Sequence, residues 1–327
     1  MKHKMNENVA ASAVSRKYLF LGAFGVFLLL VIFLVDLDQL RINAVQNLQI
    51  DALAKEYRRL ASLLEEKKTR RLPHCIIIGA RKCGTRALLD AIALHPLVKP
   101  ARYEVHYFDS NETYTRGYDW YTAQMPLTVS GEITIEKTPG YFTSSMAPER
   151  IYHMNESIKL ILIVRNPVVR TISDFTQVHY TKQAKNKTQL PFASVAFSKS
   201  GLLLENYKPV RNSLYSKHLL RWLKYFPLDQ ILIVDGDHFI SEPLAELRRV
   251  ERFLHLEPEI HSSQMYFNRT KGFFCFRHAD GKPPKCLGET KGRSHVEIGE
   301  AAENNLRRQF APYNEKFFSL IGHRFDW

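Results

Sequence analysis

The longest apolar run of the chain covers residues 18–35 (YLFLGAFGVFLLLVIFLV), 18 positions without a charged side chain. A run of this length reaches the lower limit for a helix that crosses a lipid bilayer. Four Lys or Arg residues precede the run, whereas Asp36 and Asp38 follow it, and this asymmetry places the N-terminus in the cytoplasm. We therefore predict a cytoplasmic tail (1–17), a single transmembrane signal anchor (18–35) and a lumenal remainder. A cleaved signal peptide is the alternative, although no small-x-small cleavage site follows the run.

A weaker helical pattern follows the anchor. Apolar side chains recur at helical spacing among many charges, at Val45, Leu48, Ala52, Leu60 and Leu63. We interpret residues 36–72 as a helical stem. A solvated spacer explains this mixed composition better than a self-associating helix does.

The rest of the chain alternates between two apolar patterns. Three continuous apolar runs suit strands that are buried on both faces of a parallel sheet. They lie at residues 75–80 (CIIIGA), 158–164 (IKLILIV) and 230–234 (QILIV). Helical stretches are expected at residues 85–94, 213–225 and 243–254. Because Pro73 ends the stem, residues 73–327 are predicted to form one α/β domain, a parallel sheet flanked by helices on both faces.

The net charge of the chain indicates what kind of molecule it binds. The net charge is +13, of which the first 35 residues contribute +3 (four basic, one acidic), so about +10 belongs to the predicted lumenal part. A basic surface of this kind attracts polyanions. In a lumen these are sulfated and carboxylated glycans, so we expect an acidic glycan partner and no nucleic acid.

The cysteines and the N-x-S/T sequons fit the same compartment. Cys275 and Cys286 lie 11 residues apart in a loop-like stretch, and in an oxidising lumen we predict that they form a disulfide. Cys75 and Cys83 are as compatible with small buried thiols as with a redox role. Four sequons could accept glycans there. They lie at Asn111, Asn155, Asn186 and Asn268.

The first apolar run leads into the loop GARKCGTR (79–86) and then into a predicted helix. Glycines allow backbone N–H groups to approach an anion, and a helix N-terminus adds partial positive charge. Lys82, Thr85 and Arg86 add side-chain donors, so the loop is of the P-loop type and should bind phosphate. A kinase is disfavoured, because Thr85 stands where a nucleotide triphosphatase has lysine and the run 158–164 ends at Arg165, not at an acidic magnesium ligand.

A second anion site is indicated after the run 158–164. Arg165 follows this run directly, and Ser173 lies two helical turns later. Ligands of open α/β sheets collect at the carboxyl edge of the strands. Spacing alone leaves a surface ion pair as an equally good explanation of Arg165.

Six motifs then occur in the order IIIGARKCGTRALL, EVHYFD, EKTPGYF, IVRNPVVRTISDFTQV, YFNRTKGFFC and KGRSH. Together they resemble the heparan sulfate glucosamine 3-O-sulfotransferases, from about Pro73 to Trp327. The resemblance implies a sulfotransferase fold and a single-pass type II protein of the Golgi membrane. It also implies sulfo transfer from 3′-phosphoadenosine 5′-phosphosulfate (PAPS) to the 3-OH of glucosamine in heparan sulfate.

The resemblance assigns the donor site. The 5′-phosphosulfate of PAPS would lie in the loop at Lys82, Cys83, Gly84, Thr85 and Arg86. The 3′-phosphate would contact Arg165 and Ser173. The late motif would close over the nucleotide, although taken alone it is an ordinary basic loop. Its residues are Lys291, Gly292, Arg293, Ser294 and His295.

The resemblance also assigns the chemistry. Sulfo transfer to a hydroxyl requires a base near the acceptor and cations around the transferred group, but no metal. Glu104 is the implied base. His106 would orient either Glu104 or the sugar, Asp109 would support this network, and Lys82 and Lys137 would stabilise the transferred charge. If EVHYFD is extended, Glu104, His106 and Phe108 share one face.

The implied acceptor contacts come from four segments of the chain. They are Glu104, Val105, His106, Tyr107, Phe108, Asp109, Ser110, Lys137, Thr138, Pro139, Gly140, Gln177, Tyr207 and Lys208.

Three positions depart from the family pattern. Cys83 replaces a usual glycine, Asn166 an acidic residue, and Gly140 an alanine or serine. If position 83 needs a positive φ, a side chain there would weaken donor binding. The alternative hypothesis is therefore a catalytically weak or inactive relative that binds heparan sulfate.

Overall fold

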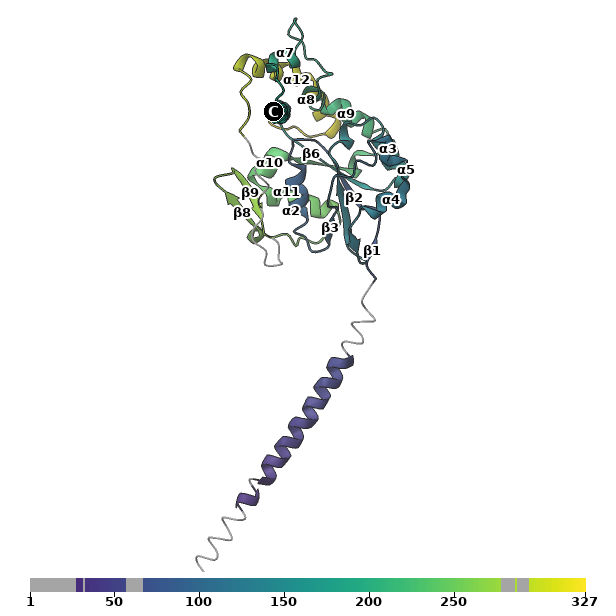
Figure 1. Ribbon diagram of the computed structural model, residues 1–327, viewed down its shortest axis with the longest axis vertical. Helices are drawn as coiled ribbons and strands as arrows, with labels where there is room; N and C mark the ends of the chain where they lie inside the picture. Colours follow the sequence, from purple (N-terminus) through teal and green to yellow (C-terminus); the bar gives the residue numbers. More distant parts are fainter. Residues whose placement is uncertain (1–27, 32, 57–66, 278–285, 287–293) are drawn as a thin grey trace, which may run out of the picture. The chain divides into compact units, whose positions relative to one another are not determined.

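The computed structural model describes residues 28–31, 33–56, 67–277, 286 and 294–327. The chain divides into two compact units, residues 1–67 and residues 68–327. In the first unit, residues 28–31 and 33–56 are helical (Figure 1), which agrees with a helical stem up to residue 56. None of the helices in these described ranges is both long and apolar enough to cross a membrane. Most of the predicted anchor, residues 18–27 and 32, lies outside the described residues.

A five-stranded sheet forms the centre of the second unit. All its strand pairs are parallel, in the order β3-β5-β2-β6-β7, which confirms the predicted α/β class. The strands are β2 (Cys75–Gly79), β3 (Val98–Pro100), β5 (Ile133–Lys137), β6 (Lys159–Val164) and β7 (Ile231–Asp235). The apolar pattern did not predict β3 and β5. Strand β5 has the sequence ITIEK and is almost completely buried. Its two charged residues interrupt the apolar pattern by which a buried strand is recognised.

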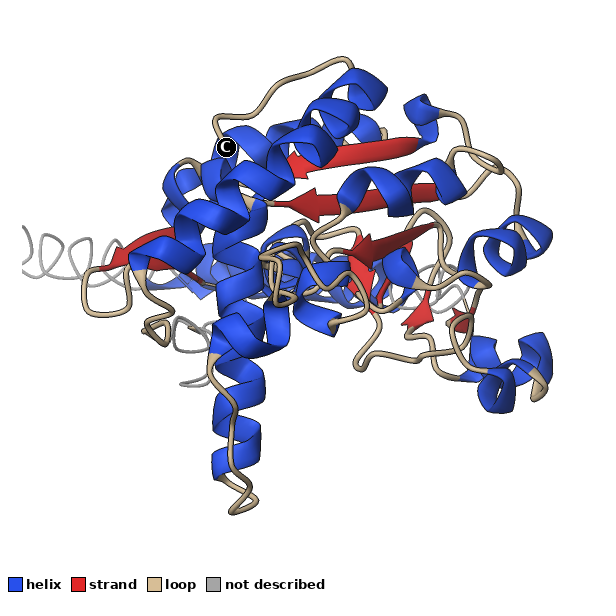
Figure 2. Ribbon diagram, turned by 90° about the horizontal axis from the view of Figure 1, so that it is seen from above, coloured by secondary structure: helices blue, strands red, loops and turns tan. Residues whose placement is uncertain are grey.

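Helices cover both faces of this sheet (Figure 2). The chain leaves β2 toward β3 and leaves β6 in the opposite direction toward β7. Right-handed crossovers therefore place α2 (Thr85–Ile92) on one face and α9 (Tyr215–Trp222) on the other. The predicted helices are confirmed, with ends that differ by up to three residues.

The remaining helices connect or extend these layers. They are α3 (Asn111–Tyr114), α4 (Gly117–Ala123), η1 (Tyr141–Thr143), α5 (Ala147–Met154), α6 (Pro167–Gln183), α7 (Phe192–Ala196), α8 (Lys208–Arg211), η2 (Leu228–Gln230), α10 (Gly236–Ser241), α11 (Pro243–Phe253), η3 (Ser262–Gln264) and α12 (Glu300–Ile321). Helix α11 packs on α2, and α12 packs on α9.

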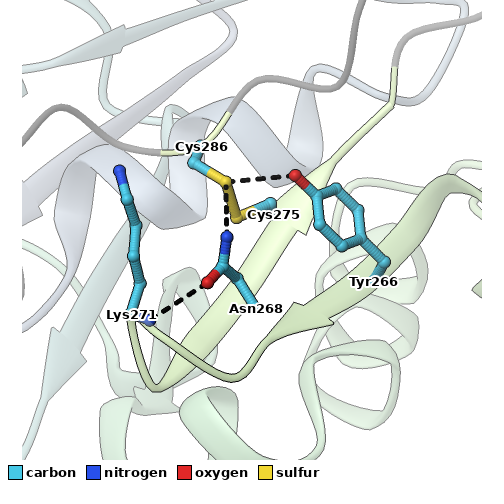
Figure 3. The surroundings of a disulfide bond; sticks show 5 residues. All are labelled: Tyr266, Asn268, Lys271, Cys275 and Cys286. Atoms are coloured by element: carbon cyan, nitrogen blue, oxygen red, sulfur yellow. Dashed lines mark hydrogen bonds between the residues drawn. A yellow bond between two sulfur atoms is a disulfide. The ribbon is translucent and has the colours of Figure 1, made fainter.

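Two small antiparallel sheets complete the unit. One pairs β1 (Thr69–Arg70) with β4 (Leu127–Thr128), and the other is the hairpin of β8 (Met265–Asn268) and β9 (Phe273–Phe276). A disulfide joins Cys275 on β9 to Cys286, as the sequence predicts (Figure 3). The Tyr266 hydroxyl lies 3.2 Å from the Cys286 sulfur, and the Asn268 side-chain amide lies 3.7 Å from it (Figure 3). The disulfide therefore ties the chain after the hairpin back onto it.

The two free cysteines lie in the core. Burial raises the pKa of the Cys83 thiol to about 11 and that of Cys75 still further. Neutral buried thiols react slowly, because the thiolate is the nucleophile. Both residues therefore behave as small core side chains.

Candidate active site

The ends of three neighbouring strands converge at one edge of the sheet. Strand β5 ends at Lys137, β2 leads into the loop 79–86, and β6 is followed by Arg165. The direction of the crossovers reverses around these strands, which is where open α/β sheets bind ligands. A cavity of about 780 Å³ lies there.

This cavity brings most of the predicted site residues together. Those that line it are Lys82, Cys83, Gly84, Thr85, Arg86, Glu104, His106, Asp109, Lys137, Pro139, Gly140, Arg165, Ser173, Gln177, Lys208 and His295.

The loop 79–86 has two residues with positive φ. These are Lys82 (φ 73°) and Gly84 (φ 102°), whereas Cys83 is not among the residues with positive φ. Cys83 is 3% exposed, and its sulfur lies 3.4 Å from the Tyr215 hydroxyl in the core. A side chain at position 83 is therefore compatible with the loop, which removes the reason to expect weak donor binding.

Glycine is required at the start of this loop. A Cβ at Gly79 would lie 2.5 Å from the Cβ of Phe142, too close for two carbon atoms. Gly84 is the N-cap of α2, so no side chain caps this helix. The first N–H groups of α2 can therefore donate to a bound anion.

Arg165 both lines the cavity and forms an ion pair. Its guanidinium contacts Asp237 Oδ1 at 2.9 Å from Nη2 and 3.1 Å from Nε. The Tyr215 hydroxyl donates to the Arg165 carbonyl at 2.9 Å. The neighbouring Asn166 caps α6 through its side-chain oxygen, a role that an acidic residue also fills.

His295 is the described residue of the late motif that reaches the cavity. Burial, and then the positive charges of Arg165 and Lys82, lower the pKa of this histidine. It therefore lies close to both cations. Ser294 is exposed, and the predicted contacts Lys291, Gly292 and Arg293 lie outside the described residues.

Glu104 lies in a chain of charged side chains on the cavity wall. Its Oε1 accepts a hydrogen bond from Lys137 Nζ, and its Oε2 lies 3.6 Å from His106 Nε2. His106 Nδ1 in turn lies 2.9 Å from Asp109 Oδ2. His106, followed by Lys137, lowers the pKa of Glu104 to about 2 against the effect of burial. Asp109 and then Glu104 raise the pKa of His106 to about 10.

The segment EVHYFD is not extended. His106 has a φ of 52°, which turns the chain so that Tyr107 and Phe108 enter the core with 1% and 0% exposure. Phe108 therefore does not share a face with Glu104 and His106. Tertiary packing of these aromatic rings overrides the period-two pattern.

Several implied acceptor contacts lie behind the cavity wall. Thr138 is buried, and its hydroxyl accepts from the Val105 N–H at 3.0 Å. Ser110 caps α3, and the Tyr207 hydroxyl is buried. These residues do not line the cavity, and neither do Tyr107 and Phe108, so their contact with the acceptor stays a prediction.

A buried carboxyl group supports the wall from behind. Glu136 is 0% exposed, and its Oε1 accepts from the Thr138 hydroxyl. The Tyr121 hydroxyl donates to Oε2 at 3.4 Å. Burial raises the pKa of Glu136 to about 7. Through Thr138 and Val105, Glu136 positions the segment that carries Glu104.

Gly140 has a steric role that the sequence did not show. A Cβ there would lie 2.5 Å from Asp109 Oδ2 and 3.3 Å from His106 Cε1. The glycine therefore allows Asp109 to lie directly beside the turn after β5.

Sequence reasoning missed a further set of lining residues. They include Arg81, Thr143, Thr176, Thr181, Arg211, Asn212, Phe239, Ile240, Lys271, Phe273, Phe274 and Phe276. Arg211 could have been found, because it lies three residues after Lys208 on the same helix. The aromatic residues of β9 carry no local signal, since only the fold brings the hairpin to the cavity.

The sequons differ in exposure. Asn111, Asn155 and Asn186 are exposed, whereas Asn268 is partly buried against the disulfide (Figure 3). Within the described ranges, no group of three or more His, Cys, Asp or Glu side chains could hold a metal ion. That the reaction needs no metal stays a prediction.

Comparisons with known proteins agree with this geometry. The sulfotransferase domain family matches residues 72–317. Human heparan sulfate glucosamine 3-O-sulfotransferase 5 is 48% identical over 275 residues, which cover 84% of this chain and 78% of that protein. Human heparan sulfate glucosamine 3-O-sulfotransferase 3A1 is 44% identical over 82% of this chain and 65% of that protein.

Similarity in structure extends further. The crystal structure of a sulfotransferase from Alicyclobacillus acidocaldarius has a TM-score of 0.56 at 19% identity. The match covers 78% of this chain and 98% of that one, and at this identity it shows the shared fold. With the family match and the identities above, the chain belongs to the heparan sulfate glucosamine 3-O-sulfotransferase family of sulfotransferases.

Proposed function

We propose that the chain transfers a sulfo group from PAPS to the 3-OH of glucosamine in heparan sulfate, with Glu104 as the general base. The observation that carries this proposal is the cluster of Glu104, Lys137 and His106 beside the loop 79–86 in one cavity. The names of the relatives support heparan sulfate glucosamine as the acceptor.

The charges of the cluster define the roles of its members. Glu104 takes the proton of the acceptor hydroxyl, and Asp109 holds His106 in place beside it. While Lys137 and His106 hold the pKa of Glu104 at about 2, this carboxylate is ionised but weakly basic. When Lys137 turns its charge toward the transferred group, Glu104 becomes a stronger base.

The donor loop fits an anionic nucleotide. The uncapped N-terminus of α2 offers N–H donors, and Lys82 and Arg165 lie near His295 with positive charge. PAPS would supply an activated sulfo group, whose sulfur bonds to the acceptor oxygen as its bond to the bridging phosphate oxygen breaks. Lys82 and Lys137 would stabilise the charge on that group.

The test is sulfo transfer from radiolabelled PAPS to heparan sulfate by wild type and Glu104→Gln. The variant should lose about 100-fold or more in rate, since general bases contribute 10²–10⁴-fold. It should still show a PAPS-dependent rise in Tm, because the donor loop is unchanged. Glu112→Gln is the matched control, since this nearby carboxylate is 85% exposed and does not line the cavity.

Two results would refute parts of the proposal. Full activity of Glu104→Gln would show that another group is the base. A wild-type protein that binds heparin, shows no PAPS-dependent rise in Tm and transfers no sulfo group would instead be the glycan-binding relative.

We also propose that residues 18–35 anchor the chain in the Golgi membrane, with the stem (36–72) and the domain 73–327 in the lumen. The hydropathy and charge asymmetry of the sequence and the exposure of Asn111, Asn155 and Asn186 support this topology. In cells, glycosidase treatment should increase the electrophoretic mobility of the full chain. An unchanged mobility, together with fractionation of the chain in the cytosol, would contradict this topology.

A further inference from the structure

A second cavity adjoins the active site. Its volume is about 480 Å³, and four residues line both cavities. They are Asp109, Gly140, Thr143 and Arg211. Because Gly140 has no side chain, nothing at this position fills the junction between them.

The second cavity is rich in cations. Arg211, Lys217 and Arg221 line it, together with the carboxylates of Asp109 and Glu205. Glu205 pairs with Lys217 at 2.5 Å, and Asp109 is engaged by His106. Within the described part of the chain, neither carboxylate pairs with Arg211 or Arg221.

Arg221 is held in a fixed position without a counter-ion. Its Nη2 donates to the Thr143 carbonyl at 3.1 Å and contacts His218 Nδ1. His218 Nε2 lies 2.7 Å from the Arg211 carbonyl, so the ring fits as a neutral tautomer that accepts at Nδ1 and donates at Nε2. Burial, and then the positive charges of Arg221, Arg211 and Arg170, lower the pKa of His218 to about 4.

The two guanidinium groups repel each other. Burial and the positive charge of Arg211 lower the pKa of Arg221. The Nε of Arg221 is buried and has no hydrogen-bond acceptor among the described residues. Two neighbouring cations with unused donors are stabilised by an anion placed between them.

We propose that this cavity is a subsite for an acidic group, a carboxylate or sulfo group, on the saccharide unit that flanks the acceptor glucosamine, bound by Arg211 and Arg221. This subsite rests on the proposed function. Arg211 lines both cavities, so one continuous chain can occupy the two. The subsite selects acceptors that carry negative charge on one side of the reacting unit.

The test is the KM for heparan sulfate of Arg211→Gln and Arg221→Gln. Each should raise KM about tenfold, more than it lowers kcat, as expected for loss of one charge-assisted hydrogen bond. The PAPS-dependent rise in Tm should stay as in wild type. Arg252→Gln is the matched control, an exposed arginine of α11 outside both cavities.

Modified acceptors distinguish the source of the anion. Carboxyl-reduced and O-desulfated heparan sulfate should be assayed beside the native polymer. The difference in KM between variant and wild type should disappear with one of the two modified polymers. The group that this polymer lacks is then the group that the subsite binds. An equal KM rise on all three polymers, or a wild-type KM in both variants, would overturn the subsite.

Folding and activity are controlled separately. Arg221 contacts Thr143 and His218, so its variant could lose stability, which Tm reports. The Arg211 side chain forms no ion pair within the described ranges, so its variant tests the subsite independently. A wild-type protein without sulfo transfer would refute the proposed function, whereas an active wild type with unchanged variants would refute only the subsite.

Discussion

Glu136 is the residue whose replacement tests the electrostatics of the site most directly. Its carboxyl group is completely buried, and burial raises its pKa from 4.5 to about 7. The folded state thus binds a proton that the unfolded state releases between these pH values. Wild-type stability should therefore fall as pH rises through this window, by about 3 kcal/mol in total.

Glu136→Gln removes this dependence and keeps an oxygen that accepts from Thr138. Relative to wild type, the variant should gain about 2–3 kcal/mol in unfolding free energy between pH 5 and pH 8. For a unit of this size that is roughly 5–10 °C in Tm. Thermal unfolding at both pH values measures it, with the exposed Glu149→Gln as control. If the unfolding free energies of wild type and Glu136→Gln changed equally with pH, the assignment of a protonated buried carboxyl group would be refuted.

Three further changes have expected outcomes. Lys137→Ala should raise the pKa of Glu104 and so move the acid limb of the pH–rate profile to higher pH. It should also lower the rate about 10²–10³-fold. An unshifted pH–rate profile would contradict the pairing of Lys137 with Glu104. Cys275→Ser should lower the stability by about 2–3 kcal/mol in a thermal unfolding assay, because an 11-residue loop is no longer closed, and an unchanged Tm would argue against this. Cys83→Gly should cost about 1–2 kcal/mol, measured in the same way, because it leaves a void beside Tyr215; if the Tm stays constant, the thiol is not packed there.

The sequence by itself determined the strands whose apolar residues are continuous. Strands β2 and β6 were found because burial on both faces demands unbroken apolar side chains, and the edge strand β7, which is only partly buried, carries a similar apolar run. The loop 79–86 was found for a local reason too, since its glycines and cations adjoin one another in the chain. The disulfide at Cys275 followed from short spacing and compartment.

Only the tertiary structure decided the parts that depend on contacts between distant segments. Strand β5 carries Glu136 and Lys137, and charged residues do not normally indicate a buried strand. They are tolerated here because Thr138 donates a hydrogen bond to Glu136 and Lys137 pairs with Glu104, contacts that only the fold reveals. The turn at His106 arises because packing of aromatic rings outweighs local periodicity. The second cavity could not be predicted, since Arg211 and Arg221 meet Gly140 only where separate elements converge. Local patterns thus predicted three of the five central strands, the main helices and the loop 79–86, while long-range packing brought Glu104, Glu136 and the pair Arg211 and Arg221 together around that loop.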